Sequence, residues 1–202
     1  MENLFLAVNV VDGVKARMRS SFASASRLLD FGFRPVRDDC LHLSIQSLGR
    51  YDRIPDALIK QAALIGSRVE VPAFPATFDR LQGFNGTYGR AIVLTSSRPA
   101  DGFLTLRKAI WAEMQLAGME LPPGPDFAPH VTLAYQRSRI PTIPVKPVTW
   151  VVHDLVLIRS LIGRSRHAHI GRWPLWMPAA LSAWPLTAPF DLLARRGEGA
   201  EL

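Results

Sequence analysis

The alternation of polar and apolar positions predicts a strand over residues 126–135 that carries polar groups on one face. Side chains two apart on a strand point the same way, so His130, Thr132 and Ala134 share that face. The residues between them, together with Tyr135, form an apolar layer on the opposite face. A strand of this kind is suited to chemistry or to a buried hydrogen bond.

The same alternation occurs earlier, in residues 41–45, where His42 and Ser44 share a face opposite three apolar residues. A single His-x-Ser/Thr pattern is common, and it is typical of a core histidine whose hydrogen bonds are satisfied. Two copies, each on a strand that follows a predicted helix, favour a shared site instead. We therefore expect two strands that each present an imidazole and a hydroxyl.

The remaining periodicity predicts an α+β fold of two similar lobes, each with a small antiparallel sheet flanked by helices. Helices are expected over residues 12–29, 55–66 and 101–118. Further strands are expected over residues 4–10, 71–81, 90–95, 149–158 and 167–173.

Prolines and glycines refine this outline. Pro72 and Pro75 restrict the strand at 71–81 to a sheet edge or to an interrupted strand, because proline cannot donate a ladder hydrogen bond. The glycines in residues 83–89 predict a hairpin turn, and the prolines in 141–147 predict a connection without regular structure.

Composition bounds the setting of the protein. A chain of 202 residues with 48% hydrophobic content fits one domain, or two small lobes fused across one core. A single cysteine, Cys40, excludes an intrachain disulfide, and with no signal-peptide pattern at the start we expect a cytoplasmic location. The net charge of +7 favours polyanionic partners, although a solvated basic surface would explain it equally well.

The last part of the chain differs from the rest. Residues 173–190 contain no charged side chain, but four prolines exclude a continuous membrane helix. We expect a two-lobed domain over residues 1–174 and a Pro/Trp-rich extension over 175–202 that is partly disordered. We expect a monomer without membrane contact, in which this extension is a candidate for contact with a partner.

Two histidines on opposite sides of a bound group can act as general base and general acid at one pH. That arrangement suits phosphoester cleavage: one imidazole takes a proton from the attacking oxygen, and the other protonates the departing oxygen. Hydroxyls on the same faces can donate hydrogen bonds to the phosphate oxygens. This chemistry requires no metal or other cofactor.

Residues 41–49 and 129–133 resemble the two signature motifs of the LigT-like RNA 2',3'-cyclic phosphodiesterases, also called RNA 2'-5' ligases, of the two-histidine phosphoesterase superfamily. The likeness extends to the apolar opening at 4–8, to 34–36, and to 163–166 before Trp173. It implies a bilobal fold with a central cleft between the sheets and metal-independent hydrolysis of a 2',3'-cyclic phosphate on RNA or a nucleotide.

By position, His42 and His130 match the catalytic pair of that family, and Ser44 and Thr132 match its phosphate-binding hydroxyls. The chain departs from the family pattern at Ser47, where an aromatic residue is common. It departs again at Tyr135, where arginine is frequent. We therefore expect the catalytic pair to be retained and the substrate preference to differ.

Other residues are candidate substrate contacts. Arg137 could reach phosphate in place of an arginine at 135, and Phe84 and Tyr88 could stack on a base. Tyr135 and Arg164 are further candidates. His167 and His169 would share a strand face, but no carboxylate or thiol nearby completes a metal site, so we expect surface or nucleotide contact for them.

Three functions remain open at this point. The first is hydrolysis of a 2',3'-cyclic phosphate. The second keeps the enzyme and changes the substrate to 2'-5'-linked RNA, by ligation or cleavage, or to a small cyclic phosphate. The third is a basic RNA-binding module in which the paired histidines hold phosphate without turnover.

Overall fold

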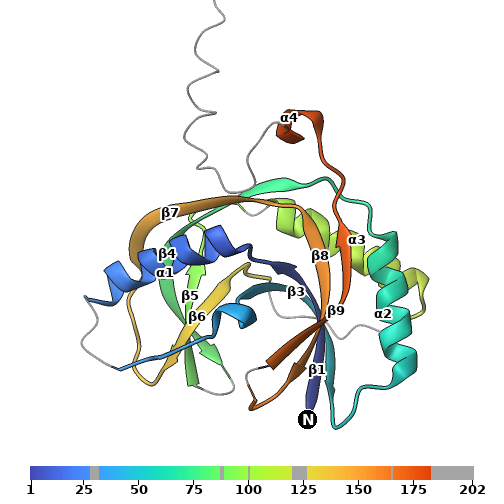
Figure 1. The fold of residues 1–202 in the computed structure, drawn as a ribbon, viewed down its shortest axis with the longest axis horizontal. Coiled ribbons are helices and arrows are strands. Elements are labelled where there is room, and N and C mark those ends of the chain that lie inside the picture. Colours follow the sequence, from blue (N-terminus) through green and yellow to red (C-terminus); the bar gives the residue numbers. More distant parts are fainter. Residues whose placement is uncertain (28–31, 87–88, 100, 120–126, 165, 183–202) are drawn as a thin grey trace, which may run out of the picture.

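Two antiparallel sheets form the body of the protein in the computed structural model, which describes residues 1–27, 32–86, 89–99, 101–119, 127–164 and 166–182. Sheet A has the strand order β3-β1-β8-β9, with bounds β3 His42–Tyr51, β1 Glu2–Asn9, β8 Asp154–Leu161 and β9 Arg166–Pro174. Sheet B has the order β2-β6-β5-β4-β7, with bounds β2 Arg34–Pro35, β6 Val131–Gln136, β5 Gly89–Thr95, β4 Phe74–Gly86 and β7 Ile143–Val152. The two sheets lie to the right and left in Figure 1.

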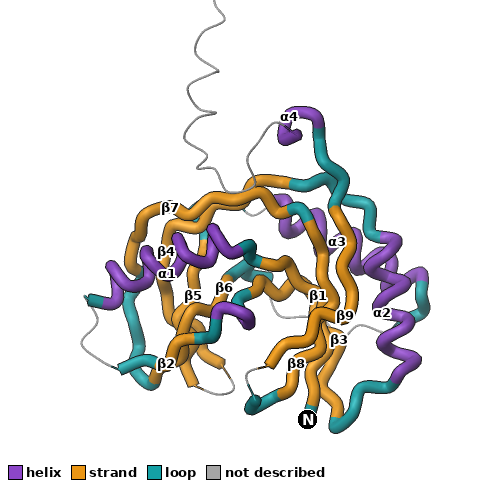
Figure 2. The backbone as a smooth tube through the Cα atoms, in the orientation of Figure 1, coloured by secondary structure: helices purple, strands orange, loops and turns teal. Residues whose placement is uncertain are grey.

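The helices do not simply alternate with the sheets. Helix α1 (Asp12–Ser26) follows β1 of sheet A but packs on β7 of sheet B. Helix α3 (Asp101–Leu116) follows β5 of sheet B, yet it contacts β3 of sheet A as well as β4. Helix α2 (Asp56–Arg68) packs beside α3 and against β8 and β9, as Figure 2 shows at the right. Each sheet is therefore covered by a helix that comes from the other part of the chain.

Polar contacts fix α3 in this position. The indole Nε1 of Trp111 donates to Oε1 of Gln46 on β3 at 2.7 Å. Just after the C-terminal end of the helix, the side-chain amide of Gln61 on α2 donates to the carbonyl oxygen of Ala117 at 2.8 Å. Helices α2 and α3 thus pack together against sheet A, where α3 contacts β3 and α2 contacts β8 and β9.

Strand β1 runs through the middle of sheet A and is buried on both faces. Leu4, Leu6 and Val8 are fully buried in the large core that also contains the helices. Phe5 and Ala7 point to the other face, where they form a small separate cluster with Val156 and Ile158 of β8. This second face is the one that carries His42 and Ser44 of β3.

The prediction of an α+β fold with two antiparallel sheets is confirmed, and two details of the strand prediction were wrong. The apolar run predicted as one strand over 149–158 is divided at His153 between β7 in sheet B and β8 in sheet A. Pro144 and Pro147 of the predicted connection lie inside β7, an edge strand, where a residue without an N–H is tolerated, and only Pro141 precedes it.

Pro75 was expected at a sheet edge or in an interrupted strand, and it lies in a part of β4 that is paired on one side only. Strand β4 lies between β5 and β7, but it pairs with β5 only from Arg80 onward. Pro75 precedes that point and pairs with Val151 of β7 alone. This part of β4 is therefore an edge, as the proline requires. The hairpin predicted for residues 83–89 is present as the pairing Gly86 with Gly89, and its two turn residues lie outside the described part of the chain.

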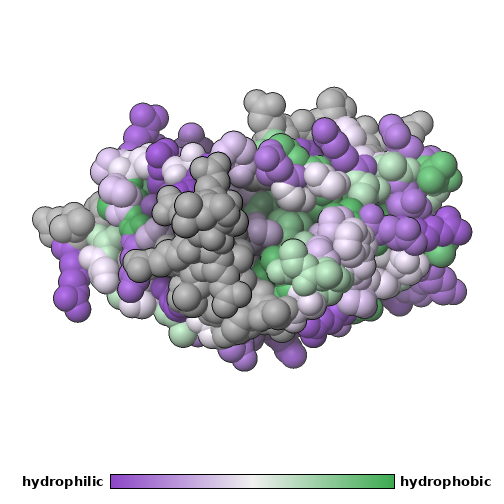
Figure 3. Space-filling model, turned by 90° about the horizontal axis from the view of Figure 1, so that it is seen from above, coloured by the Kyte–Doolittle hydropathy of each residue, from purple (hydrophilic) through white to green (hydrophobic). Residues whose placement is uncertain are grey.

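After β9 the chain crosses to sheet B. The backbone N–H of Ala73 donates to the carbonyl oxygen of Trp176, and α4 (Ala179–Ser182) follows. Trp176 is 56% exposed on this side. Figure 3, which views that side, shows hydrophilic residues at both ends of the long axis and more apolar ones near the middle. No helix among the described residues is long and apolar enough to cross a bilayer. The predicted extension lies largely outside the described residues, so its division at residue 174 stays a prediction.

A close contact between α2 and β9 leads to a prediction at Gly66. A Cβ atom at Gly66 would lie 2.3 Å from the ring of Trp173. Helix propensity alone would make Gly66→Ala stabilising by about 1 kcal/mol, whereas overpacking a filled site typically destabilises by about 1–3 kcal/mol. We expect packing to dominate, so that Gly66→Ala lowers the free energy of unfolding by roughly 1–2 kcal/mol in urea titrations.

The neighbouring substitution Ser67→Ala is the matched control. Ser67 is exposed on the same helix, and its hydroxyl bonds only the carbonyl of Leu64 within that helix. Its effect should stay within about 0.5 kcal/mol. A stabilised Gly66→Ala protein would show that Trp173 is not held against α2.

Candidate functional site

His42 begins β3, and a main-chain carbonyl fixes the orientation of its ring. The Nδ1 atom lies 2.8 Å from the carbonyl oxygen of Cys40, two residues earlier. A carbonyl only accepts hydrogen bonds, so Nδ1 carries the proton, and in the neutral ring Nε2 is the acceptor. The Nε2 atom lies 3.1 Å from the hydroxyl of Ser44, which then donates to it. His42 therefore presents a basic nitrogen on the polar face of sheet A.

His130 has the same local geometry, one residue before β6. Its Nδ1 atom lies 2.7 Å from the carbonyl oxygen of Ala128, again two residues earlier. Nε2 is thus the basic nitrogen of the neutral ring here too, and no described residue forms a hydrogen bond with it. The predicted strand over 126–135 was too long at its start, because regular pairing begins only at Val131.

The i−2 carbonyl bond alone does not identify a functional histidine. His153, between β7 and β8, has its Nδ1 atom 3.2 Å from the carbonyl oxygen of Val151. What distinguishes His42 and His130 is that they lie near each other, where β3 of sheet A contacts β6 of sheet B. The charge of His130 is one of the influences that lower the pKa of His42.

Burial is the main cause of the perturbed acidity of His42. Desolvation of the ring, followed by the charge of His167, lowers its pKa from the usual 6.5 to about 4, against the opposing effect of the bond to the Cys40 carbonyl. The ring nevertheless keeps part of its surface accessible. His42 is consequently neutral at pH 7, with Nε2 available to accept a proton.

The two hydroxyls predicted to bind phosphate have different surroundings. Ser44 is exposed on β3, and its donor is engaged by His42. Thr132 is half-buried on β6, paired across the sheet with Val93 of β5. Ser44 therefore has to turn away from His42 before it can donate to another acceptor.

A β-bulge changes the faces of β6 beyond Thr132. The pairing with β5 slips by one residue between Thr132 and Ala134. Ala134 is fully buried, although the alternation placed it on the face of His130. Tyr135 was predicted in the apolar layer. It is instead half-buried beside Arg34, whose guanidinium lies 5.8 Å from the centre of its ring. The predicted alternation was therefore correct only up to the bulge, because a bulge shifts every later side chain to the other face.

Each histidine has an aromatic neighbour. The ring centroids of Phe5 and His42 lie 4.9 Å apart, and those of Phe84 and His130 lie 5.0 Å apart. Phe84 was a predicted substrate contact, whereas Phe5 was missed because nothing in an apolar strand signals contact with a candidate histidine. His167 was assigned to the surface or to nucleotide contact, but it lies against His42, with ring centroids 4.9 Å apart.

The remaining predicted contacts are not assembled into a site by the described structure. Arg137 is exposed after the end of β6, and Arg164 is exposed in the turn between β8 and β9. Neither side chain forms a hydrogen bond or ion pair with another described residue. Tyr88 lies outside the described residues. These three residues stay predictions.

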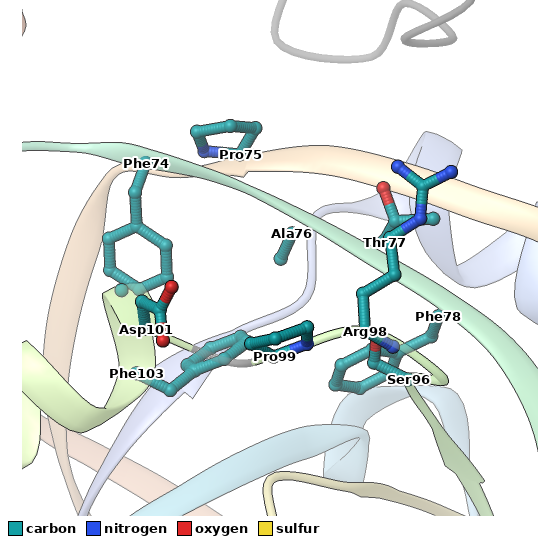
Figure 4. Close-up of a pocket in the computed structure, with 11 residues that line it drawn as sticks. Phe74, Pro75, Ala76, Thr77, Phe78, Ser96, Arg98, Pro99, Asp101 and Phe103 are labelled. Atoms are coloured by element: carbon teal, nitrogen blue, oxygen red, sulfur yellow. The ribbon is translucent and has the colours of Figure 1, made fainter.

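A cavity of about 300 Å³ lies elsewhere, between β4 and the start of α3 (Figure 4). Phe74, Phe78 and Phe103 line it, with Arg98 and Asp101 as its charged residues. It includes neither candidate histidine. Among the described residues, no three His, Cys, Asp or Glu side chains are grouped to hold a metal ion.

Comparison with known proteins identifies the family of the chain independently of the geometry of the site. The family model for the 2'-5' RNA ligase superfamily matches residues 16–163, which include both histidine motifs. The RNA 2',3'-cyclic phosphodiesterase of Thermus thermophilus is 32% identical over 167 residues, covering 78% of this chain and 81% of that protein.

Solved structures agree with this match. The protein TT0787 of Thermus thermophilus superposes with a TM-score of 0.68 and 25% identity, over 86% of this chain and 97% of that one. LigT of E. coli in its apo form gives a TM-score of 0.67 and 25% identity, over 87% and 98% of the two chains. The similarity thus covers both sheets.

The lowered pKa of His42 leads to a prediction about stability. Between pH 6.5 and about pH 4 the unfolded chain binds a proton at His42 that the folded protein does not. The free energy of unfolding should therefore fall as the pH decreases through this window, by at most about 3 kcal/mol for this residue. His167 and His169, whose pKa values are also lowered by burial, act in the same direction.

Urea titrations at pH 7.0, 5.5 and 4.5 measure this effect. His42→Gln should have a shallower pH dependence than the wild type, because it lacks the group that the folded state keeps neutral. Equal slopes for the two proteins would contradict the assignment of His42 as a desolvated imidazole.

Proposed function

The chain belongs to the 2'-5' RNA ligase superfamily, and we propose that it hydrolyses a 2',3'-cyclic phosphate on RNA or on a nucleotide to a 2'-phosphomonoester. The observation that carries this proposal is the pair of histidines at the junction of the sheets, each held through Nδ1 by a main-chain carbonyl. Two imidazoles with the same fixed tautomer can supply the base and the acid of a phosphoester cleavage.

The reaction uses the two Nε2 atoms. One neutral imidazole removes a proton from water as the water oxygen attacks phosphorus, and the bond between phosphorus and the 3' oxygen breaks. The other imidazole, protonated at Nε2, gives its proton to that 3' oxygen. The phosphate remains on the 2' oxygen, and the two histidines have exchanged protonation states.

The pKa of His42 favours this residue as the base. With a pKa of about 4 its ring is neutral at pH 7, which is the form that accepts a proton. His130 then has the role of the acid. With a 5' hydroxyl in place of water as the attacking group, the same ring opening would leave the phosphate bonded to both the 2' and the 5' oxygen, so 2'-5' ligation requires no further acid or base.

Hydroxyls and an aromatic ring complete the proposed site. Ser44 lies 3.1 Å from Nε2 of His42, and a phosphate oxygen near that nitrogen would be within reach of the Ser44 hydroxyl once it turned. Thr132, two residues after His130, takes the corresponding role on β6. Phe84 lies against His130 and keeps part of its ring exposed, which suits stacking on the terminal base.

Histidine substitutions test the proposal directly. Wild type, His42→Asn and His130→Asn are assayed with a nucleoside 2',3'-cyclic phosphate and with RNA ending in a cyclic phosphate, in the presence of EDTA. We expect each variant to lose about 10²–10⁴-fold in kcat, because removing a general acid or base costs that much. EDTA should leave the wild-type rate unchanged.

His153→Asn is the matched control, since His153 also bonds an i−2 carbonyl but lies at the link between β7 and β8. It should retain wild-type activity. The proposed hydrolysis would be wrong if the wild type bound RNA without hydrolysing either substrate. Intact RNA binding in both variants would then identify the protein as a binding module.

Hydroxyl substitutions give a second prediction. Ser44→Ala removes a donor to the phosphate and frees Nε2 of His42, whereas Thr132→Val removes a donor without changing the shape of the side chain. We expect each to lower kcat/KM by about 10-fold to 10³-fold, the range for a lost donor to developing charge. Steady-state kinetics with both substrates measures this. A change below twofold in both variants would exclude the hydroxyls from phosphate binding.

A further inference from the structure

A third histidine lies in the immediate surroundings of His42. The rings of His42 and His167 meet at an interplanar angle of 71°, with centroids 4.9 Å apart. Phe5 lies under both, at 4.9 Å from His42 and 5.9 Å from His167. The three rings therefore form one contact group.

The contact joins the two edges of sheet A. His42 is on β3 and His167 is on β9, with β1 and β8 between them. Such edges meet only if the sheet coils strongly, which the right-handed twist of antiparallel strands allows. Phe5 on the inner strand β1 lies on the concave face of the sheet, in contact with both rings. The short 3-10 helix η1 (Asp38–Cys40), just before His42, also contacts β9. The position of the His42 ring thus depends on β9.

One ring nitrogen of His167 has no hydrogen-bond partner among the described residues. This nitrogen, Nδ1, is buried. Burial and the charge of His169 lower the pKa of His167, while the charge of Asp39 on η1 opposes this effect. Asp39 is in turn paired with Arg37 at 2.7 Å. The ionisable groups that act on the two rings are His130 before β6, His169 on β9 and Asp39 on η1.

Two imidazoles in contact cannot both take a proton without strong repulsion. We propose that His167 is a positioning residue of this reaction, which holds the His42 ring in place against Phe5 and opposes its protonation in the absence of an anionic phosphate. The role rests on the proposed function of His42. It makes β9 part of the catalytic apparatus, although His167 need not touch the substrate.

Two substitutions separate the charge of His167 from its shape. His167→Phe retains an aromatic ring beside His42 and removes the ionisable group. His167→Gln removes the ring as well. Each protein is checked for folding by thermal unfolding, and the imidazole resonances of His42 are followed by NMR from pH 3.5 to pH 8.

In His167→Phe the NMR titration of His42 should move to higher pH by about 0.5–1 unit, because a like charge about 5 Å away is removed. The acid limb of kcat/KM should move by the same amount, with kcat on the plateau changed less than about threefold. In His167→Gln the His42 ring also loses its support, and plateau kcat should fall by roughly 10-fold to 10²-fold, as expected for a misplaced catalytic group.

His153→Gln is the control and should leave the titration of His42 unchanged. The proposal would be refuted if the pKa of His42, followed by NMR, were unchanged in both His167 variants. A large rise in KM with an unchanged pH profile would also refute it, because His167 would then be a substrate contact. The NMR titration requires no turnover. An inactive wild type would therefore refute the proposed function, while the titration would still decide whether His167 controls His42.

Discussion

A hydrogen bond to a main-chain carbonyl determines what each candidate histidine can do. Nδ1 of His42 is bound to the carbonyl of Cys40, and Nδ1 of His130 to that of Ala128. These bonds use the nitrogen that could otherwise compete for a proton, and they fix both rings relative to the start of a strand. The tautomer of each ring is therefore set by the backbone just before β3 and β6.

The pair becomes a site only because two sheets meet. His42 belongs to sheet A and His130 precedes a strand of sheet B, and the contact of β3 with β6 brings them together. Burial at this junction lowers the pKa of His42. The same packing therefore provides both the geometry and the protonation state that the proposed cleavage of a cyclic phosphate requires.

Period-two alternation was sufficient to separate the polar residues of the two motifs from the core, because Leu43 and Val131, which lie between them, are fully buried. It failed at Ala134, where a bulge in β6 reverses the faces. It failed again at 149–158, because a run that is buried in two sheets in succession is interrupted at the change of sheet only by the two residues His153 and Asp154. The contact of His167 with His42 joins residues 125 positions apart across a coiled sheet. Local sequence patterns carry no signal for such a contact.

The exchange of helices between the sheets has a consequence for how the protein assembles. Helix α1 is made directly after the first strand of sheet A, but its packing partner β7 is more than a hundred residues later in the chain. Helix α3 likewise returns to β3 from the middle of sheet B. Neither lobe contains all the parts of its own core, so the two halves must fold as one cooperative unit. The strand, helix and histidine motif of each half are thus parts of one packing unit, in which separately expressed halves would have to associate before either could fold.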